Sequence, residues 1–125
     1  MRAWRIATDA PDYPADDLTG AGAKITGGRW NRAGRPILYC ADSPSLACLE
    51  TLVHLGTGDL PLNRYLVGID IPDQVWNARE IHTPATLPVG WDAIPPVILT
   101  NPSHQDAGAI TAVKLRKWLY DPRLR

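Results

Sequence analysis

Three side chains in the central part of the chain have the chemistry to bind one anionic ligand: Arg29, Tyr39 and Glu50. A guanidinium grips phosphate through two parallel hydrogen bonds, and a tyrosine ring offers a stacking face with a polar tip. The Glu50 carboxylate can accept hydrogen bonds from ribose hydroxyls and stabilise positive charge that develops on a sugar carbon. The set therefore matches a ligand that holds pyrophosphate, ribose and a flat cationic ring. NAD+ has all three.

Each of these residues also has an ordinary structural interpretation. An arginine beside paired glycines is commonly a solvated turn residue, a helical glutamate is commonly exposed, and a tyrosine on an apolar strand usually packs in the core. Their succession on neighbouring elements favours a common site over three separate explanations. We predict Arg29, Tyr39 and Glu50 as catalytic residues, and we predict a ligand-binding set that consists of Gly28, Arg29, Trp30, Asn31, Tyr39 and Glu50.

The elements that must position these side chains can be read from local patterns. Gly27 and Gly28 allow a backbone path that is closed to other residues, and they remove side chains where a ligand approaches. A second turn over residues 31–34 leads into a predicted strand at 37–41. In that strand, alternation places Ile37 and Tyr39 on one face and the intervening residues on the other.

The residues after this strand carry a sharp helix signal. Ser43 fits the N-cap and Pro44 the first helical position. Leucines recur at helical spacing up to Gly56, a good C-terminal stop. We therefore predict a helix over 44–55. Within it, Glu50 is surrounded by apolar residues, so its carboxylate should be partly buried and should require a partner.

The remainder of the chain predicts short elements joined by turns. Twelve prolines and ten glycines in 125 residues argue against a helical bundle. Strands are expected at 3–7, 64–71, 97–100 and 113–120; loops at 9–18, 58–63 and 83–95; a turn at 101–104; and a short strand or irregular crossing at 75–81. The length favours a single domain over residues 1–125.

Charge and composition exclude several functions. The formal net charge is zero, whereas nucleic-acid binding by bulk charge requires a strong excess of Lys and Arg. We expect no direct nucleic-acid binding. Residues 24–35 nevertheless hold four basic side chains and no acid, which suits a small anionic ligand.

No apolar run approaches 18 residues and no signal peptide is visible, so we expect no membrane association and a cytoplasmic location.

Cysteine and histidine usage gives no support for a metal site. Cys40 and Cys48 lie in apolar, patterned segments, where cysteine usually acts as a small hydrophobic residue. The three histidines are far apart in sequence, and no pair has the spacing of helical metal ligands. We therefore expect no metal.

Taken together, residues 27–31, 37–41 and 46–55 resemble the RES domain, the toxin half of bacterial RES–Xre type II toxin–antitoxin pairs. Residues 101–104 and 121–124 match the C-terminal pattern of that family. The resemblance implies an α+β fold similar to that of ADP-ribosyltransferase toxins, with a small mixed β-sheet and few helices around NAD+. It also implies growth inhibition through NAD+ degradation, by a NAD+ glycohydrolase or phosphorylase or by a mono-ADP-ribosyltransferase.

Carried over by position, the resemblance implies roles for three residues. Arg29 would hold the phosphate or ribose of NAD+, Tyr39 would line the nicotinamide end, and Glu50 would support cleavage of the nicotinamide–ribose bond. The implied partner is an Xre-like helix-turn-helix antitoxin, with a possible homodimer inside a larger toxin–antitoxin complex.

The sequence departs from the family in one segment. The family serine follows an apolar-Pro pair, whereas residues 91–101 form a short connection without any serine. The chain therefore lacks the segment that carries the family Ser. Two further hypotheses stay open: a catalytically impaired, shortened RES domain that acts mainly as an antitoxin-binding module, and a stand-alone ligand-binding domain unrelated to toxins.

Overall fold

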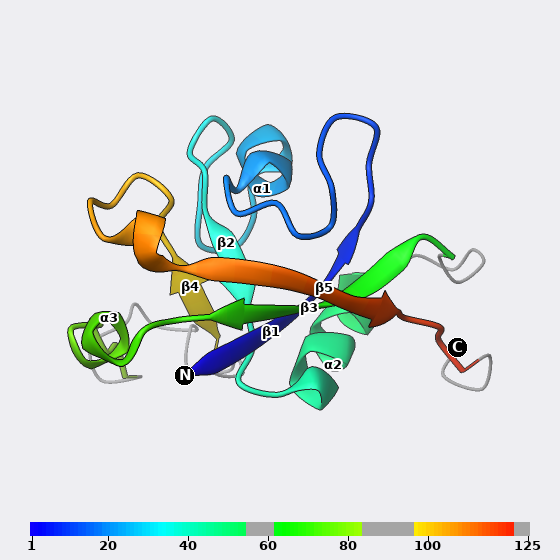
Figure 1. The fold of residues 1–125 in the computed structure, drawn as a ribbon. Helices are drawn as coiled ribbons and strands as arrows, with labels where there is room; N and C mark the ends of the chain where they lie inside the picture. Colours follow the sequence, from blue (N-terminus) through cyan, green and yellow to red (C-terminus); the bar gives the residue numbers. More distant parts are fainter. Residues whose placement is uncertain (55–61, 84–96, 122–125) are drawn as a thin grey trace.

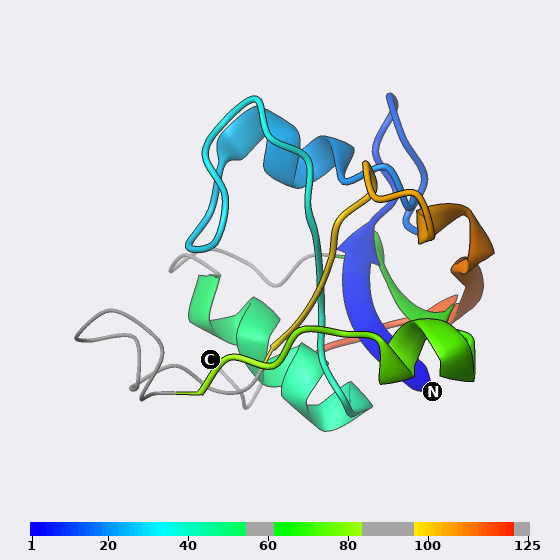
Figure 2. The same cartoon turned by 90° about the vertical axis from the view of Figure 1, so that its left-hand side faces the viewer.

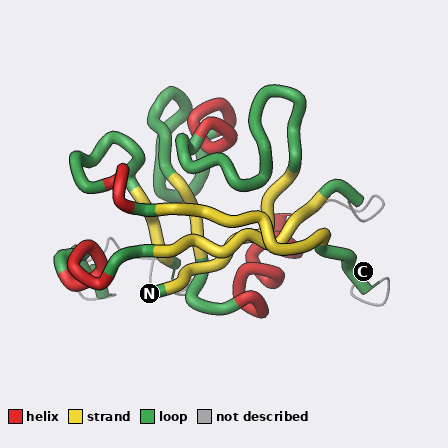
Figure 3. Tube along the Cα trace, in the orientation of Figure 1, coloured by secondary structure: helices red, strands yellow, loops and turns green. Residues whose placement is uncertain are grey.

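A computed structural model describes residues 1–54, 62–83 and 97–121 of the chain. The described strands form two antiparallel sheets with few helices around them (Figures 1 and 3), which confirms the α+β class. The first sheet has the order β1-β3-β5, from β1 (Arg2–Thr8), β3 (Arg64–Asp70) and β5 (Thr111–Lys117). The second sheet pairs β2 (Leu38–Cys40) with β4 (Ile98–Thr100). The helical segments are α1 (Ala21–Thr26), α2 (Pro44–His54), α3 (Asp73–Asn77) and the 3-10 turn η3 (Ala107–Ala109).

β3 is the middle strand of the larger sheet, and both of its faces are covered. It pairs with β1 from Arg2↔Asp70 to Thr8↔Arg64, and with β5 on its other side. Leu66 and Val67 are adjacent in sequence and are both buried. Because successive side chains on a strand point to opposite faces, one hydrophobic cluster lies on each side of the sheet.

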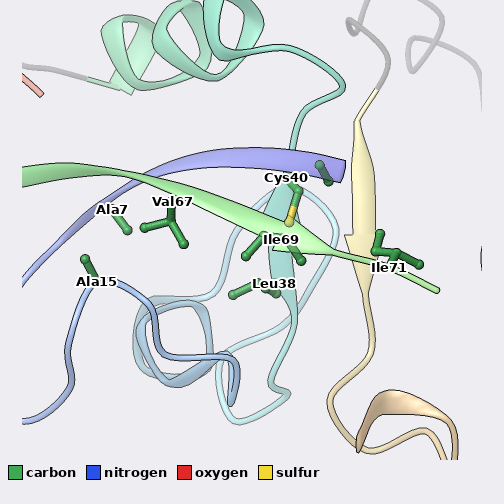
Figure 4. Close-up of a cluster of buried hydrophobic side chains, with 8 residues drawn as sticks. Ala7, Ala15, Leu38, Cys40, Val67, Ile69 and Ile71 are labelled. Carbon is green, nitrogen blue, oxygen red and sulfur yellow. The ribbon is translucent and has the colours of Figure 1, made fainter. Parts of the chain in front are cut away.

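One cluster lies between the larger sheet and the smaller one. Val67 and Ile69 from β3 meet Leu38 and Cys40 from β2, and all four are buried (Figure 4). The expected alternation in 37–41 is therefore present, because Leu38 and Cys40 face the core. Burial raises the pKa of the Cys40 thiol to about 11, so this residue behaves as a small hydrophobic group.

The second cluster lies on the opposite face of the sheet, where α2 packs against β1. Its buried members are Ile6, Ala41, Ala47, Leu66 and Tyr120. The hydroxyl of Tyr120 also lies 2.8 Å from that of Thr51 on α2. This contact attaches the residues after β5 to the helix that carries Glu50.

Most predicted elements in the described ranges are confirmed. Strands occupy the core of the intervals expected at 3–7, 37–41, 64–71 and 97–100, and α2 covers 44–54 of the helix expected at 44–55. The last strand runs from Thr111 to Lys117 rather than over 113–120. Gly56 and nearly all of the loops expected at 58–63 and 83–95 lie outside the described residues.

Two local predictions need correction. The interval 75–81 is neither strand nor crossing at its start, because α3 spans Asp73–Asn77. Pro72 occupies its N-cap position and Asp73 its first turn, where a negative charge is favourable. The sequence also gave no indication of α1, which contains glycine and is only six residues long. Tertiary hydrogen bonds to the Ala23 and Lys24 carbonyls hold its last turn.

No helix in the described parts of the chain is long and apolar enough to cross a membrane.

Candidate functional site

A cleft of about 650 Å³ brings together most of the predicted site residues. Its volume lies within the range of about 300–1,000 Å³ that is usual for small-molecule sites. Gly28, Arg29, Trp30, Tyr39 and Glu50 all line it. The walls come from β1, α1, the turn after α1, β2 and α2. Figure 2 shows α1 and this turn above α2, with the chain of β2 running between them.

The hydroxyl group of Tyr39 holds the Gly-Gly-Arg-Trp-Asn turn (residues 27–31) in place through two hydrogen bonds. The Tyr39 hydroxyl accepts a hydrogen bond from the Trp30 backbone N–H at 3.0 Å and donates one to Asn31 Oδ1 at 2.7 Å. A Cβ atom at Gly28 would lie only 2.8 Å from the same hydroxyl oxygen. Glycine is therefore favoured at 28, because a larger residue would have to displace the phenol.

Asn31 is the member of the predicted ligand set that does not line the cleft. Its Nδ2 donates to the carbonyls of Ala23 and Arg35, each at 2.8 Å, while Oδ1 accepts from Tyr39. These bonds connect the end of α1, the turn and β2. Asn31 thus positions the turn in this structure, and its direct contact with a ligand stays a prediction.

Glu50 reaches the cleft from the middle of α2. The helix begins where predicted: Ser43 Oγ accepts a hydrogen bond from the Leu46 backbone N–H at 3.1 Å. Glu50 is partly buried, as expected. The expected partner is absent, because no hydrogen bond or ion pair joins this carboxylate to any residue that the structure describes. Its acceptor oxygens are therefore available to a ligand.

Arg29 is exposed at the mouth of the cleft. Within the described ranges no carboxylate pairs with it and no hydrogen bond fixes its guanidinium. Gly27, with a φ of 69°, ends α1 just before it. This left-handed conformation favours glycine and turns the chain so that Arg29 follows on the cleft side.

Sequence reasoning missed two further arginines in the cleft. Arg5 from β1 and Arg64 from β3 both line it, and the Nε of each is buried without a hydrogen-bond partner in the described structure. A signal for Arg5 was present in the sequence, because Arg5 shares one face of its strand with Ala3 and Ala7, and both alanines are buried. A charge at such a position is unusual in a structural strand.

The fold and cleft define a class of protein: a small α+β domain whose cleft is lined by three arginines and by a carboxylate that has no partner among the described residues. The model of the RES domain family matches residues 2–118 of this sequence. The chain therefore belongs to the RES domain family, in agreement with the resemblance found in its motifs.

Relatives of the chain are named as toxins. It is 53% identical to the "Prs ADP-ribosylating toxin" of Sphingobium sp. (strain YBL2), over 97% of this chain and 94% of that protein. It is 46% identical to a "Toxin Res" of Photorhabdus laumondii, over 70% of this chain and 54% of that protein. It is 42% identical to a "Toxin Res" of Pseudomonas putida, over 80% and 63% of the two chains.

The first of these alignments is longer than the chain itself. It runs over 152 positions and so exceeds the 125 residues present here by 27. At least 27 positions of the alignment to the Sphingobium toxin therefore have no residue in this chain. The Sphingobium toxin therefore has residues that this chain lacks.

Proposed function

We propose that this chain is the toxin of a bacterial type II toxin–antitoxin system and consumes NAD+. The observation that carries the proposal is the partly buried, unpaired Glu50 carboxylate in the cleft that Arg29 and Tyr39 also line. A relative named as an ADP-ribosylating toxin supports it, because ADP-ribose is transferred to proteins from NAD+.

In the proposed reaction, the bond between the nicotinamide nitrogen and ribose C1′ breaks. The bonding electrons stay on nicotinamide, which leaves as a neutral ring, and positive charge develops on the ribose. The Glu50 carboxylate stabilises that charge electrostatically. Arg29 binds phosphate or ribose oxygens, and the Tyr39 ring lines the nicotinamide end.

A nucleophilic oxygen then bonds to C1′ and releases its proton to solvent. Water gives a glycohydrolase reaction and phosphate gives a phosphorylase reaction. A protein side chain gives mono-ADP-ribosylation, the activity in the name of the Sphingobium relative. We further propose an Xre-like helix-turn-helix antitoxin as partner, with a homodimer inside the complex.

The test is the loss of NAD+ on incubation with the purified chain, followed by chromatography of nicotinamide and ADP-ribose products. Arg29→Lys should raise the KM for NAD+ by about tenfold, which is about 1.4 kcal/mol of binding free energy, because a lysine lacks the bidentate fork. Arg32→Lys is the matched control, since Arg32 is also exposed but does not line the cleft. NAD+ that stays intact with the wild-type chain rules out turnover.

A second function is favoured by one specific observation, the 27 or more alignment positions that have no counterpart here. On this alternative the chain is a catalytically impaired RES domain that mainly binds an antitoxin. Expression without an antitoxin separates the two proposals. Growth arrest with falling NAD+ supports the toxin, whereas normal growth with normal NAD+ and retained antitoxin binding supports the binding module.

A further inference from the structure

Thr51 lies beside Glu50 on the part of the cleft wall that α2 provides. Ala47, Glu50 and Thr51 all line the cleft, and their spacing of three and four residues places them on one face of the helix. Thr51 is half-buried, so its side chain belongs to this wall without being sealed in the core. The wall therefore carries a hydroxyl group next to the candidate catalytic carboxylate.

The hydrogen bonds of Thr51 determine how its hydroxyl group is used. The Thr51 O–H donates to the backbone carbonyl of Cys48 at 2.7 Å, and a carbonyl can only accept. The Tyr120 hydroxyl oxygen lies 2.8 Å from the same Thr51 Oγ. Because the single proton of Thr51 is already engaged, Tyr120 is the donor in this second bond. Toward any third group, Thr51 in this arrangement acts as an acceptor.

Tyr120 supports this arrangement from behind the wall. Its side chain is 8% exposed and packs in the hydrophobic cluster that also contains Ala47, and it does not line the cleft. A buried phenol requires a partner for its O–H. The proton of Tyr120 therefore occupies one of the two acceptor positions of Thr51 Oγ.

The other acceptor position of Thr51 Oγ is not used by any residue that the structure describes. Ligand sites combine apolar walls with a few placed polar groups that fix the orientation of the ligand. We infer that Thr51 Oγ accepts a hydrogen bond from the ligand in the cleft and thereby recognises a donor group, either a ribose hydroxyl or a carboxamide N–H. This inference rests on the proposed function, because both donor groups belong to NAD+.

Three small probes distinguish the two donor groups. ADP-ribose contains the ribose hydroxyls without nicotinamide, and nicotinamide contains the carboxamide without ribose. Nicotinic acid is the matched probe for nicotinamide, because its carboxylate has no N–H to donate. Titrations followed by ligand-detected NMR measure the affinity of each probe for each variant.

The variants separate a ligand contact from support of the helix. Thr51→Val removes the acceptor at nearly constant shape, but it leaves the Tyr120 O–H buried without a partner. The decisive comparison is therefore between Tyr120→Phe, which keeps the Thr51 oxygen, and the double variant Thr51→Val, Tyr120→Phe, which has neither hydroxyl. Thr111→Val is the control, because Thr111 is exposed and does not line the cleft.

Tyr120→Phe and Thr111→Val should bind all three probes within about twofold of wild type. The double variant should bind the recognised probe about three- to tenfold more weakly than Tyr120→Phe does, the loss expected for one neutral hydrogen bond. A loss with ADP-ribose assigns the donor to a ribose hydroxyl. A loss with nicotinamide but not with nicotinic acid assigns it to the carboxamide. Either result supports the inference.

Equal affinities of Tyr120→Phe and the double variant for both ADP-ribose and nicotinamide overturn the inference, even if both variants bind more weakly than wild type. Thr51 would then act only by holding α2 in place. If the double variant does not fold, Thr51→Val is compared with Thr51→Ser, which keeps the oxygen and should bind like wild type.

The binding measurements do not depend on turnover, so the inference and the proposed reaction can fail separately. A wild-type chain that binds a probe through Thr51 but consumes no NAD+ supports the inference and removes the proposed reaction. A chain that consumes NAD+ with no contribution from Thr51 to binding does the reverse.

Discussion

At the scale of single residues, Glu50 carries a charge that the described part of the fold leaves unpaired. A carboxylate that is partly buried on a helix normally gains a partner, because desolvation disfavours the charged form. Glu50 instead faces a cleft that holds three arginines in its walls, Arg5, Arg29 and Arg64. An acid among cations in one cleft is the pattern expected for a ligand with both a cationic ring and an anionic linker.

The replacement Glu50→Gln tests this residue directly. It keeps the shape and removes the charge, so kcat for NAD+ consumption should fall by about 100-fold or more. The melting temperature should be unchanged or slightly higher, because no protein partner is lost. Glu80→Gln is the control, since Glu80 is exposed and lies outside the cleft lining. Wild-type kcat in Glu50→Gln would contradict a catalytic role.

At the scale of elements, the turn and β2 act as one unit through the Tyr39 hydroxyl. The phenol is hydrogen bonded on both sides, to Trp30 and Asn31. Its hydroxyl therefore serves to hold the turn, and the ring is what remains to face a ligand. The position of Arg29 consequently depends on a hydrogen bond made by a residue ten positions later in the chain.

Gly28→Ala should disturb this unit. The new methyl group would lie 2.8 Å from the Tyr39 oxygen and 3.1 Å from Asn31 Oδ1, so we expect a loss of about 1–3 kcal/mol in the free energy of unfolding from overpacking. Gly108→Ala is the control, because a Cβ there meets nothing within 4 Å. Urea unfolding measures both.

A double-mutant cycle sharpens the same prediction. Tyr39→Phe removes the oxygen that the new methyl group contacts, so the effects of Gly28→Ala and Tyr39→Phe should be less than additive. Strict additivity would show that the phenol and the Gly28 backbone are not coupled in this way.

The N-cap of α2 is a second structural feature at the scale of elements. Ser43→Ala removes the oxygen that accepts the Leu46 N–H and should cost about 1 kcal/mol of stability. Ser45→Ala is matched to it, because Ser45 is an exposed residue of the same helix with no hydrogen bond in the described structure. Equal urea midpoints for the two variants would exclude a capping role for Ser43.

At the scale of the whole molecule, two ion pairs connect segments that are far apart in sequence. Asp70 of β3 pairs with Arg2 of β1, and Asp9 pairs with Lys114 of β5. Hydrogen bonds from Arg2 lower the pKa of Asp70, and the bond from Lys114 lowers that of Asp9. The first pair joins β1 to β3, and the second joins β5 to the residue that follows β1.

This arrangement predicts how stability varies with acidity. Both carboxyls have folded-state pKa values below those of the unfolded chain, which are about 3.9. Their stabilisation is therefore present above about pH 4 and is lost as the pH falls through the lowered values. Melting temperatures between pH 2 and pH 7 measure the effect. The double variant Asp9→Asn, Asp70→Asn should flatten the acid side of the profile, whereas Asp12→Asn, an exposed control, should leave it unchanged.

The sequence alone determined most of the local helices and strands, and it identified the arginine, tyrosine and glutamate as candidate site residues. The Ser43–Pro44 signal placed α2, and alternation in 37–41 put Leu38 and Cys40 on one face of the strand, which the structure shows to be the core face. Arg29, Tyr39 and Glu50 were identified as a set from their residue types on successive elements. These features depend on neighbours within a few residues, where capping and periodicity are decided.

Only the tertiary structure decided what depends on contacts between distant segments. The short helix α1 is held by hydrogen bonds from Asn31 and Gly34 to its last carbonyls, because a helix of six residues is too short to be stable alone. The unpaired state of Arg5 became visible only when β1, β3 and the cleft were assembled. Burial and hydrogen-bond pairing are properties of the folded chain, so no local pattern could establish them.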